Sequence, residues 1–420
     1  MLGLSTATFV LITLALILAV YLAWSIGAND MANSMGTSVG AKVLTPKQAV
    51  LIGAFLDALG AILVGSHVAD TVKSGIVDTM SMDTELIVLG FLASLLASCL
   101  WITAATWKGL PVSTTHSIVG AVVGFGLMAK GGTAIDWMKL LEISISWVLS
   151  PVLGAIIAFF VFKLIIKVIF ERKDPERATK IFTPFGLFFT FFMIIAASFL
   201  STPLGKRFGV GDDVLLATII SAVLAVVIST VTYFIFIRPT FIKAAKDRGV
   251  YQRVEKIFGG LHVITACYVA FAHGANDVAN AIGPIAGVME VLTEGYLSAS
   301  AEIPMNLLII GGLGIALGGL TWGYKVMRTI GFKITKLTNT RGFSAEFATA
   351  TTVLFCSKLG LPISTTHTIV GAVIGVGLAR GVSAVDLRIV GEIVISWVVT
   401  IPIAALTTAA IFFIGNTFIL

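Results

Sequence analysis

The sequence predicts an all-α polytopic membrane protein with about twelve transmembrane spans, two inverted-topology repeats and discontinuous helices at the midplane. Three observations lead to this fold class: the composition, a series of bilayer-length apolar stretches, and motifs that occur twice. The 420 residues are 57% hydrophobic and 12% charged, with a mean hydropathy of +1.02, whereas soluble domains carry roughly 25% charged residues. The 28 basic and 22 acidic side chains are too few to cover the surface of a soluble chain of this length.

Twelve apolar stretches follow one another along the chain, and the tenth is short. They lie at about residues 6–26, 48–66, 85–106, 112–129, 139–168, 185–202, 213–237, 258–283, 305–324, 345–357, 363–379 and 387–417. A membrane-spanning helix needs about 20 apolar residues, and the alternating ten-residue pattern of a transmembrane barrel does not occur. The first stretch lacks the basic n-region and cleavage site of a signal peptide, so we expect it to be the first span.

Basic residues distribute unequally between the loops and thereby predict the orientation. Twenty-two Lys and Arg residues lie on odd-numbered loops and span ends, against six on even-numbered ones. The positive-inside rule then places the odd loops in the cytoplasm and both termini outside it. We therefore expect a multi-pass protein of the cell (inner) membrane. The same rule accounts for the net charge of +6, so nucleic-acid binding is not expected.

Two motifs occur once in each half of the chain. Gly27-Ala-Asn-Asp-Met-Ala-Asn33 returns as Gly274-Ala-Asn-Asp-Val-Ala-Asn280, and residues 109–127 match residues 360–378 at 15 of 19 positions. Spans 1 to 5 and 8 to 12 are therefore interpreted as two copies of one unit. An odd number of crossings separates them, which inverts the second copy, as in secondary transporters. The predicted division is residues 1–170 for the first repeat, 171–256 for the linking spans 6 and 7 with their basic loops, and 257–420 for the second repeat.

The Asn-Asp motif offers oxygen ligands for a small hard cation. On a helix its amides and carboxylate share one side, and the flanking glycines and Pro284 would let the helix break and free backbone carbonyls. The alternative is that the amides only join helices, as Asn does in membranes, but the duplication favours the cation site. The candidate sodium ligands are Asn29, Asp30, Asn33, Asn276, Asp277 and Asn280.

The Pro-x-Ser-Thr-Thr-His motif is typical of an anion site at a helix N-terminus. Pro111 and Pro362 each precede an apolar, glycine-spaced stretch, so each marks a helix start at or within the membrane. Hydroxyls and free N–H groups of the first turn lie at the positive end of the helix dipole. Ordinary N-capping explains one copy equally well, but two inverted copies can hold a tetrahedral oxyanion between them. The candidate phosphate-binding residues are Ser113, Thr114, Thr115, Ser364, Thr365 and Thr366.

Neither motif contains Lys or Arg. A phosphate or sulfate buried there would lack charge compensation, as would the Asp30 and Asp277 carboxylates, and cations bound between them resolve both problems. The sequence therefore predicts cation-coupled transport, because each ion's site is incomplete without the other ion. His116 and His367 stay outside the predicted site, since a hydrogen bond within their own helix region explains them as well as proton transfer does.

Three further acidic residues lie in or beside spans: Asp57, Asp70 and Glu346. Each is interpreted by default as a solvated helix-end charge. An accessory cation site is the alternative interpretation.

At these motifs the sequence resembles the inorganic phosphate transporter (PiT) family. The resemblance rests on both Gly-Ala-Asn-Asp motifs, both Pro-x-Ser-Thr-Thr-His motifs and Arg341-Gly-Phe-Ser-Ala-Glu346, and so covers both halves. It implies sodium- or proton-coupled symport of inorganic phosphate through an inverted-repeat core. We expect sodium as the cation, with no cofactor and no metal other than sodium. It also implies that Asp70 and Glu346 matter for transport. The chain lacks the long central cytoplasmic loop of animal members and so resembles prokaryotic ones.

Several alternatives stay open at this point. The runner-up is a proton-coupled phosphate or sulfate permease of the same fold. A membrane enzyme that processes phosphoesters is remote, because His116 and His367 have no acidic or second histidine ligand beside them in their motifs. A primary pump is not expected because no P-loop occurs, and a channel would differ by failing to accumulate substrate. The oligomeric state is open, a homodimer being one alternative.

Overall fold

The computed structural model describes residues 5–65, 76–79, 82–200, 205, 209–210, 213–244, 249–297, 303–359, 361 and 363–418. Within these residues the regular structure is helical, apart from one isolated bridge between Val77 and Ile135. The α-helices are α1 (Thr6–Gly40), α2 (Pro46–Val64), α4 (Thr84–Trp107), α5 (Thr114–Lys130), α6 (Trp137–Ile165), α7 (Pro175–Leu200), α9 (Val214–Thr232), α10 (Arg238–Ala244), α11 (Val250–Glu294), α12 (Met305–Trp322), α13 (Tyr324–Phe332), α14 (Asn339–Lys358), α15 (Thr365–Leu378) and α16 (Leu387–Phe418). Short 3-10 or π segments are η1 (Gly131–Ala134), η2 (Ile166–Phe170), η3 (Tyr233–Ile237) and η4 (Val382–Ala384).

The helices confirm a polytopic membrane fold. Ten of the described helices are long and apolar enough to cross a membrane, and each of the twelve expected apolar stretches overlaps a helix. The two that fall outside the ten are α14, which is more polar, and α15, which has only 14 residues. Helix α15 contributes to the buried polar centre described below, and α14 contributes to a second polar cluster around Glu346. Their departure from a plain apolar span therefore has a structural reason.

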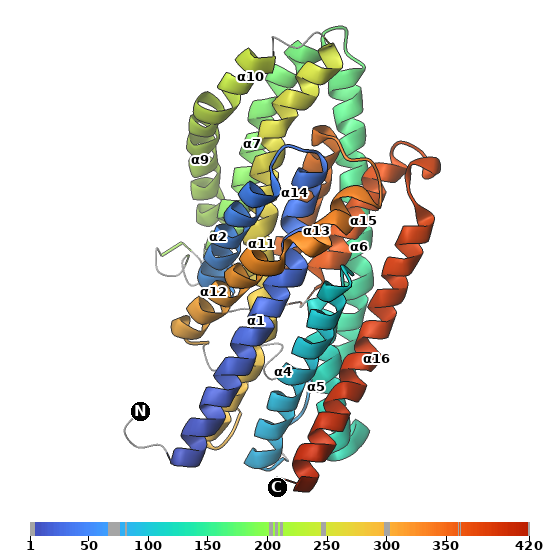
Figure 1. Cartoon of the computed structure of the whole chain (residues 1–420). Coiled ribbons are helices and arrows are strands. Elements are labelled where there is room, and N and C mark those ends of the chain that lie inside the picture. The colour runs from blue at the N-terminus through green and yellow to red at the C-terminus, as the bar shows by residue number, and fades with distance from the viewer. Residues whose placement is uncertain are drawn as a thin grey trace.

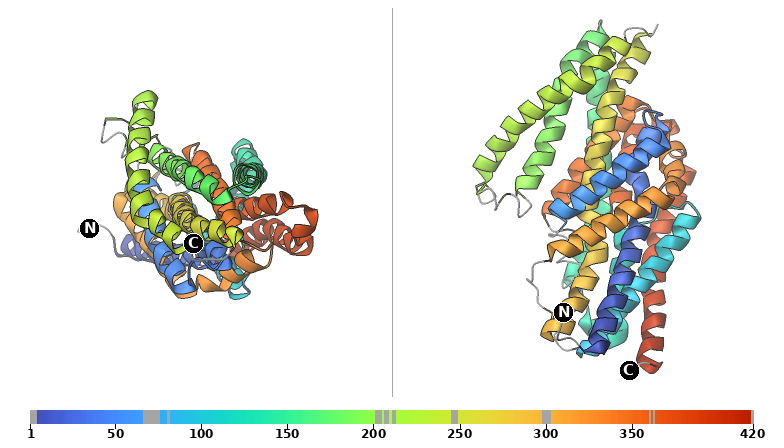
Figure 2. Two further views of the ribbon diagram at one scale, coloured as in Figure 1. Left: turned by 90° about the horizontal axis from the view of Figure 1, so that it is seen from above. Right: turned by 60° about the vertical axis from the view of Figure 1, so that its left-hand side comes forward.

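The start of α1 and the end of α16 lie at one end of the molecule, and the turn from η2 into α7 lies at the opposite end (Figure 1). Helices α7 and α9 pack on each other and stand at one side of the bundle (Figure 2). Helix α5 packs against α16, and α15 packs against α6. The short helices of each half are therefore held by the last helix of the other half.

Helices α1 and α11 pass through the centre without a break. Every residue from 25 to 39 in α1 and from 268 to 288 in α11 is buried. The expectation that flanking glycines interrupt these helices is wrong, because the glycines serve close packing instead. A Cβ on Gly27 would lie 1.8 Å from the Ile315 carbonyl oxygen, and one on Gly274 would lie 1.9 Å from the Asp57 carbonyl oxygen. Pro284 is accommodated inside α11.

The interruptions lie instead between α4 and α5 and between α14 and α15. Helix α4 ends at Trp107 and α5 begins at Thr114, with Ser113 as its N-cap; α15 begins at Thr365, with Ser364 as its N-cap. Both caps have extended backbone conformations, as N-caps do. Pro111 precedes the first of these helices as expected, and Pro362 lies outside the described residues. Two helix N-termini are thus placed in the interior of the bundle.

Candidate functional site

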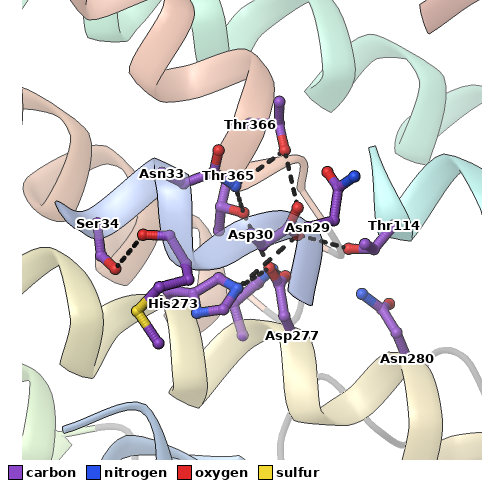
Figure 3. A network of polar contacts seen from close by, with 12 residues as sticks. Asn29, Asp30, Asn33, Ser34, Thr114, His273, Asp277, Asn280, Thr365 and Thr366 are labelled. Carbon is purple, nitrogen blue, oxygen red and sulfur yellow. Dashed lines mark hydrogen bonds and ion pairs between the residues drawn. The ribbon is translucent and has the colours of Figure 1, made fainter. Parts of the chain in front are cut away.

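The four repeated motifs converge on one buried polar centre. The Asn-Asp motifs lie inside α1 and α11, and the Ser-Thr-Thr turns begin α5 and α15 (Figure 3). All twelve candidate side chains are buried, with at most 2% of their surface exposed. The structure therefore brings these twelve predicted side chains together in one centre, whereas the accessory candidates Asp70 and Glu346 are not part of it.

Each aspartate of the centre accepts hydrogen bonds from a Ser-Thr-Thr turn. The Asp30 carboxylate accepts from the Thr114 hydroxyl at 2.9 Å and from the Thr366 hydroxyl at 3.4 Å. The Asp277 carboxylate accepts from the Thr365 hydroxyl at 2.8 Å and from the Asn276 amide at 2.6 Å. Asp30 is consequently linked to the turns of both halves of the chain.

The second asparagine of each motif donates a hydrogen bond to a threonine in the other half of the chain. The Asn33 amide donates to the Thr366 hydroxyl at 2.9 Å, and the Asn280 amide donates to the Thr115 hydroxyl at 3.2 Å. Their side-chain oxygens are buried and accept no hydrogen bond from the described residues. Because a buried carbonyl oxygen is normally satisfied, these two oxygens are available to a ligand.

The first asparagine of each motif holds the interrupted segment in place. The Asn29 oxygen accepts from the backbone N–H of Val112 at 3.3 Å, and the Asn276 amide donates to the carbonyl of Ile363 at 3.1 Å. These contacts satisfy backbone groups that the interruption leaves without helical partners. Asn29 and Asn276 thus fix the geometry of the turns.

The two interrupted segments are also joined directly to each other. The Thr115 hydroxyl donates to the Ile363 carbonyl at 3.0 Å, and the Thr366 hydroxyl donates to the Val112 carbonyl at 3.2 Å. The pairs are equivalent under the sequence repeat. The two helix N-termini are therefore positioned as a matched pair.

His273 also belongs to the centre, and the sequence motifs did not predict it. Its Nε2 lies 3.0 Å from the Asp277 carboxylate and 3.8 Å from that of Asp30, and its Nδ1 lies 2.9 Å from the Asp57 carboxylate. One ligand atom each from Asp30, His273 and Asp277 lies within 4.8 Å of the others. Comparison of the two repeats does not single out this histidine, because Ile26 occupies the equivalent position in the first copy.

The default interpretation of Asp57 as a solvated helix-end charge is wrong. Its side chain is fully buried inside α2 and faces His273. A carboxylate this deep in the bundle requires a partner, and the imidazole supplies one.

Glu346 is likewise buried rather than solvated, so its default interpretation is also wrong. Its carboxylate accepts from the hydroxyls of Thr37, of Ser38 at 3.2 Å and of Thr265 at 2.7 Å. The Nε2 of His262 lies 3.1 Å from the same carboxylate. This second polar cluster joins α14 to α1 and α11, whereas Asp70 lies outside the described residues.

The remaining members of the second motif have structural contacts. Ser113 and Ser364 accept from the backbone N–H groups of His116 and His367 at 3.1 Å, so both serines do cap their helices. The two imidazoles meet with ring centroids 4.3 Å apart, and each also packs on a tryptophan ring. The histidine pair therefore lies directly behind the turns.

A chain with ten apolar spanning helices and a buried polar centre between two interior helix N-termini is a membrane transport protein. The chain belongs to the phosphate transporter family, whose model matches residues 26–408. This finding confirms the resemblance seen in the motifs and makes the chain a phosphate transporter rather than an enzyme.

Relatives and a solved structure agree with the family. The chain is 49% identical to a Thermococcus kodakarensis protein that carries the name phosphate permease, over 93% of this chain and 94% of the relative. It is 43% identical to the chloroplastic inorganic phosphate transporter 2-1 of Arabidopsis thaliana, over 98% of this chain and 73% of that protein. A solved structure described as the sodium-dependent phosphate transporter superposes with a TM-score of 0.87 at 44% identity, over 98% of this chain and 100% of that one.

Proposed function

We propose that this protein is a secondary active transporter that imports inorganic phosphate by symport with cations, sodium above all. One observation carries the proposal: the Asp30 and Asp277 carboxylates share hydrogen bonds with hydroxyls at the N-termini of two interior helices. No Lys or Arg is among the partners described for these carboxylates. A dianion at the helix N-termini and cations at the carboxylates would balance each other. The solved structure named as sodium-dependent supports sodium as the cation.

In this proposal the anion binds at the two facing turns. Ser113, Thr114 and Thr115 share it with Ser364, Thr365 and Thr366, through hydroxyls and through the free N–H groups of the first helical turn. The hydroxyls of Thr114 and Thr365 now donate to aspartates. Rotation of these hydroxyls toward a phosphate oxygen would release the carboxylates to the cations, which couples the two events.

The cations are assigned to the same centre. The free side-chain oxygen of Asn33 with Asp30, and that of Asn280 with Asp277, supply ligands of the kind that sodium takes in transporters. Asn29 and Asn276 contribute by fixing the segments that carry the turns. Glu346, with the hydroxyls of Thr37 and Thr265, and Asp70 remain accessory cation candidates.

Proton coupling is the second candidate, and one observation favours it. His273 bridges Asp57 to Asp277 through its two ring nitrogens. An imidazole with a carboxylate at each ring nitrogen can hold a proton on both nitrogens, so this bridge could carry a proton where the first proposal places sodium.

We further propose the inverted topology, with both termini outside the cytoplasm of the cell (inner) membrane and with spans 1–5 and 8–12 as the two repeats. The common position of both termini, at the end opposite the turn into α7, supports this orientation (Figure 1). That turn carries Arg172 and Lys173, which favour the cytoplasmic side.

Reciprocal binding measurements test the proposed coupling. The phosphate Kd of the purified protein is measured by calorimetry at several sodium concentrations, and the sodium Kd at several phosphate concentrations, with potassium holding the ionic strength. We expect sodium to tighten phosphate binding and phosphate to tighten sodium binding by the same factor, as linkage requires. Phosphate affinity that is equal in sodium and potassium would overturn sodium coupling. A response to pH alone would favour the proton.

A further inference from the structure

A groove lies between α6 and α7, away from the transport centre. Its volume is about 1030 Å³, and its wall continues onto α14 through Phe343 and Phe347. The apolar side chains that line it include Val161, Leu164, Ile181, Phe182, Phe185 and Phe189. Several of them are more than half exposed: Leu164 by 51%, Phe185 by 59% and Phe189 by 52%. In a spanning bundle, such a surface faces hydrocarbon.

One end of the groove is polar and predominantly basic. Arg172, Lys173 and Arg177 line it there, beside Glu171 and Asp174. Asp174 accepts a hydrogen bond from the backbone N–H of Arg177 at 3.0 Å, so it is engaged as the cap of α7. The ion pairs described for this end of α7 involve Glu176 with Lys180 and Arg253. The side chains of Arg172, Lys173 and Arg177 have no ion-pair partner among the described residues.

The length of the groove corresponds to one leaflet of a bilayer. Arg177 and Phe189 are twelve residues apart on α7, or about 18 Å at 1.5 Å per residue. Half of a hydrocarbon core of about 30 Å is about 15 Å. The groove therefore extends from a basic surface to about the midplane, and its polar end coincides with the end of α7 that lies opposite the termini (Figure 1).

We propose that this groove binds one anionic phospholipid from the leaflet on the side of the basic turn. The lipid phosphate contacts Arg172, Lys173 and Arg177, and an acyl chain lies along the phenylalanines of α7 and α14. Basic pockets between helices at a membrane surface bind anionic head groups, and the apolar length excludes a small soluble anion as the ligand. The site is separate from the transport centre, and the bound lipid joins α6, the last helix of the first repeat, to α7, the first linking helix.

Native mass spectrometry of the full-length protein, titrated with phosphatidylglycerol in detergent, tests this proposal. Two variants probe the two ends of the groove: Arg172→Gln with Lys173→Gln removes charge, and Gly186→Leu fills the apolar part. A Cβ on Gly186 would make only ordinary contacts, at 3.6 Å from Phe182 and Phe343, so the added side chain extends into the groove. Lys333→Gln with Arg388→Gln is the charge-matched control, because both side chains are exposed and neither lines the groove.

We expect the parent to bind one phosphatidylglycerol more tightly than phosphatidylcholine. The charge variant should weaken phosphatidylglycerol binding roughly 30-fold, because each basic side chain near the surface contributes about 1 kcal/mol and two are removed. The control should weaken it by less than threefold. Gly186→Leu should weaken the binding of both phosphatidylglycerol and phosphatidylcholine. Inorganic phosphate at millimolar concentration should not displace the lipid.

Three results would overturn the proposal. The first is equal affinity of the parent for the two lipids. The second is an equal loss of phosphatidylglycerol affinity in the charge variant and in its control. The third is a dimeric parent that Gly186→Leu converts to a monomer without a change in lipid binding, since a second copy of the chain would then occupy the groove.

Discussion

The Asn33 side-chain amide donates a hydrogen bond of 2.9 Å to the Thr366 hydroxyl, across 333 residues of sequence. It joins a predicted cation ligand of the first half to a predicted anion ligand of the second half. The same hydroxyl reaches the Asp30 carboxylate at 3.4 Å. In the proposed mechanism, loss or gain of either ion would therefore rearrange groups that bind the other ion, and the two binding events would be coupled.

Replacement of either aspartate of the centre by asparagine should abolish sodium-driven phosphate uptake. Asp30→Asn and Asp277→Asn keep the shape of the side chain but remove the charge that is proposed to compensate a cation. Uptake of labelled phosphate into proteoliposomes is the measurement. Asp83→Asn is the matched control, because Asp83 is exposed at the start of α4 and makes no side-chain cap bond. Sodium dependence like that of the parent in either folded variant would remove that aspartate from the cation site.

Removal of one threonine hydroxyl from the facing turns should weaken phosphate binding roughly tenfold or more, since a hydrogen bond to a charged group contributes on the order of 1.5 to 3 kcal/mol. The variants are Thr115→Val and Thr366→Val, titrated with phosphate at saturating sodium. Thr368→Val is the control, because the Thr368 hydroxyl donates to the Ser364 carbonyl of its own helix. If the two hydroxyls only stabilised the folded state, the variants would lose thermal stability, and the protein that remained folded would keep the phosphate Kd of the parent.

His273→Gln should raise the sodium concentration needed for half-maximal uptake several-fold. The imidazole holds the Asp277 carboxylate at 3.0 Å and is itself held by Asp57 at 2.9 Å, so its loss frees the cation ligands to move. The phosphate Kd at saturating sodium should change by less than threefold, since His273 makes no described bond to the turns. Asp57→Asn preserves a hydrogen-bond partner for Nδ1 and should show a smaller shift. A larger effect on phosphate than on sodium would place His273 at the anion instead.

The motif residues could be predicted from the sequence because each polar pattern occurs in both halves of the chain. Asn33, Thr115 and Thr366 carry no separate signature, yet their recurrence at equal spacing marked them. His273 and Asp57 could not be found in this way, because the first copy has Ile26 in place of the histidine. Their proximity depends on the close approach of α2 and α11 at Gly274, a tertiary contact that no local pattern encodes.

The main wrong prediction from the sequence was that α1 and α11 are interrupted. Glycine and proline lower helix stability in isolation, which predicted breaks in α1 and α11. In the bundle the same glycines let neighbouring backbones approach, and this packing outweighs the local preference. The prolines of the second motif were the better guide, because Pro111 does lie in an interruption.

Single-cysteine labelling should verify the proposed orientation. In a background without Cys99, Cys267 and Cys356, a cysteine at Lys173 should react only from the cytoplasmic side, and one at Tyr296 only from outside. Both positions are exposed. The reversed pattern would invert the proposed topology, and labelling of both positions from one side would contradict the span order between them.

The most direct test of coupled transport is phosphate uptake into proteoliposomes with the sodium gradient and the pH gradient imposed separately. We expect an inward sodium gradient alone to accumulate phosphate above its external concentration, and its dissipation to end the accumulation. A pH gradient alone should produce no accumulation. Phosphate that only equilibrates under a sodium gradient, or that accumulates under the pH gradient alone, would contradict sodium symport.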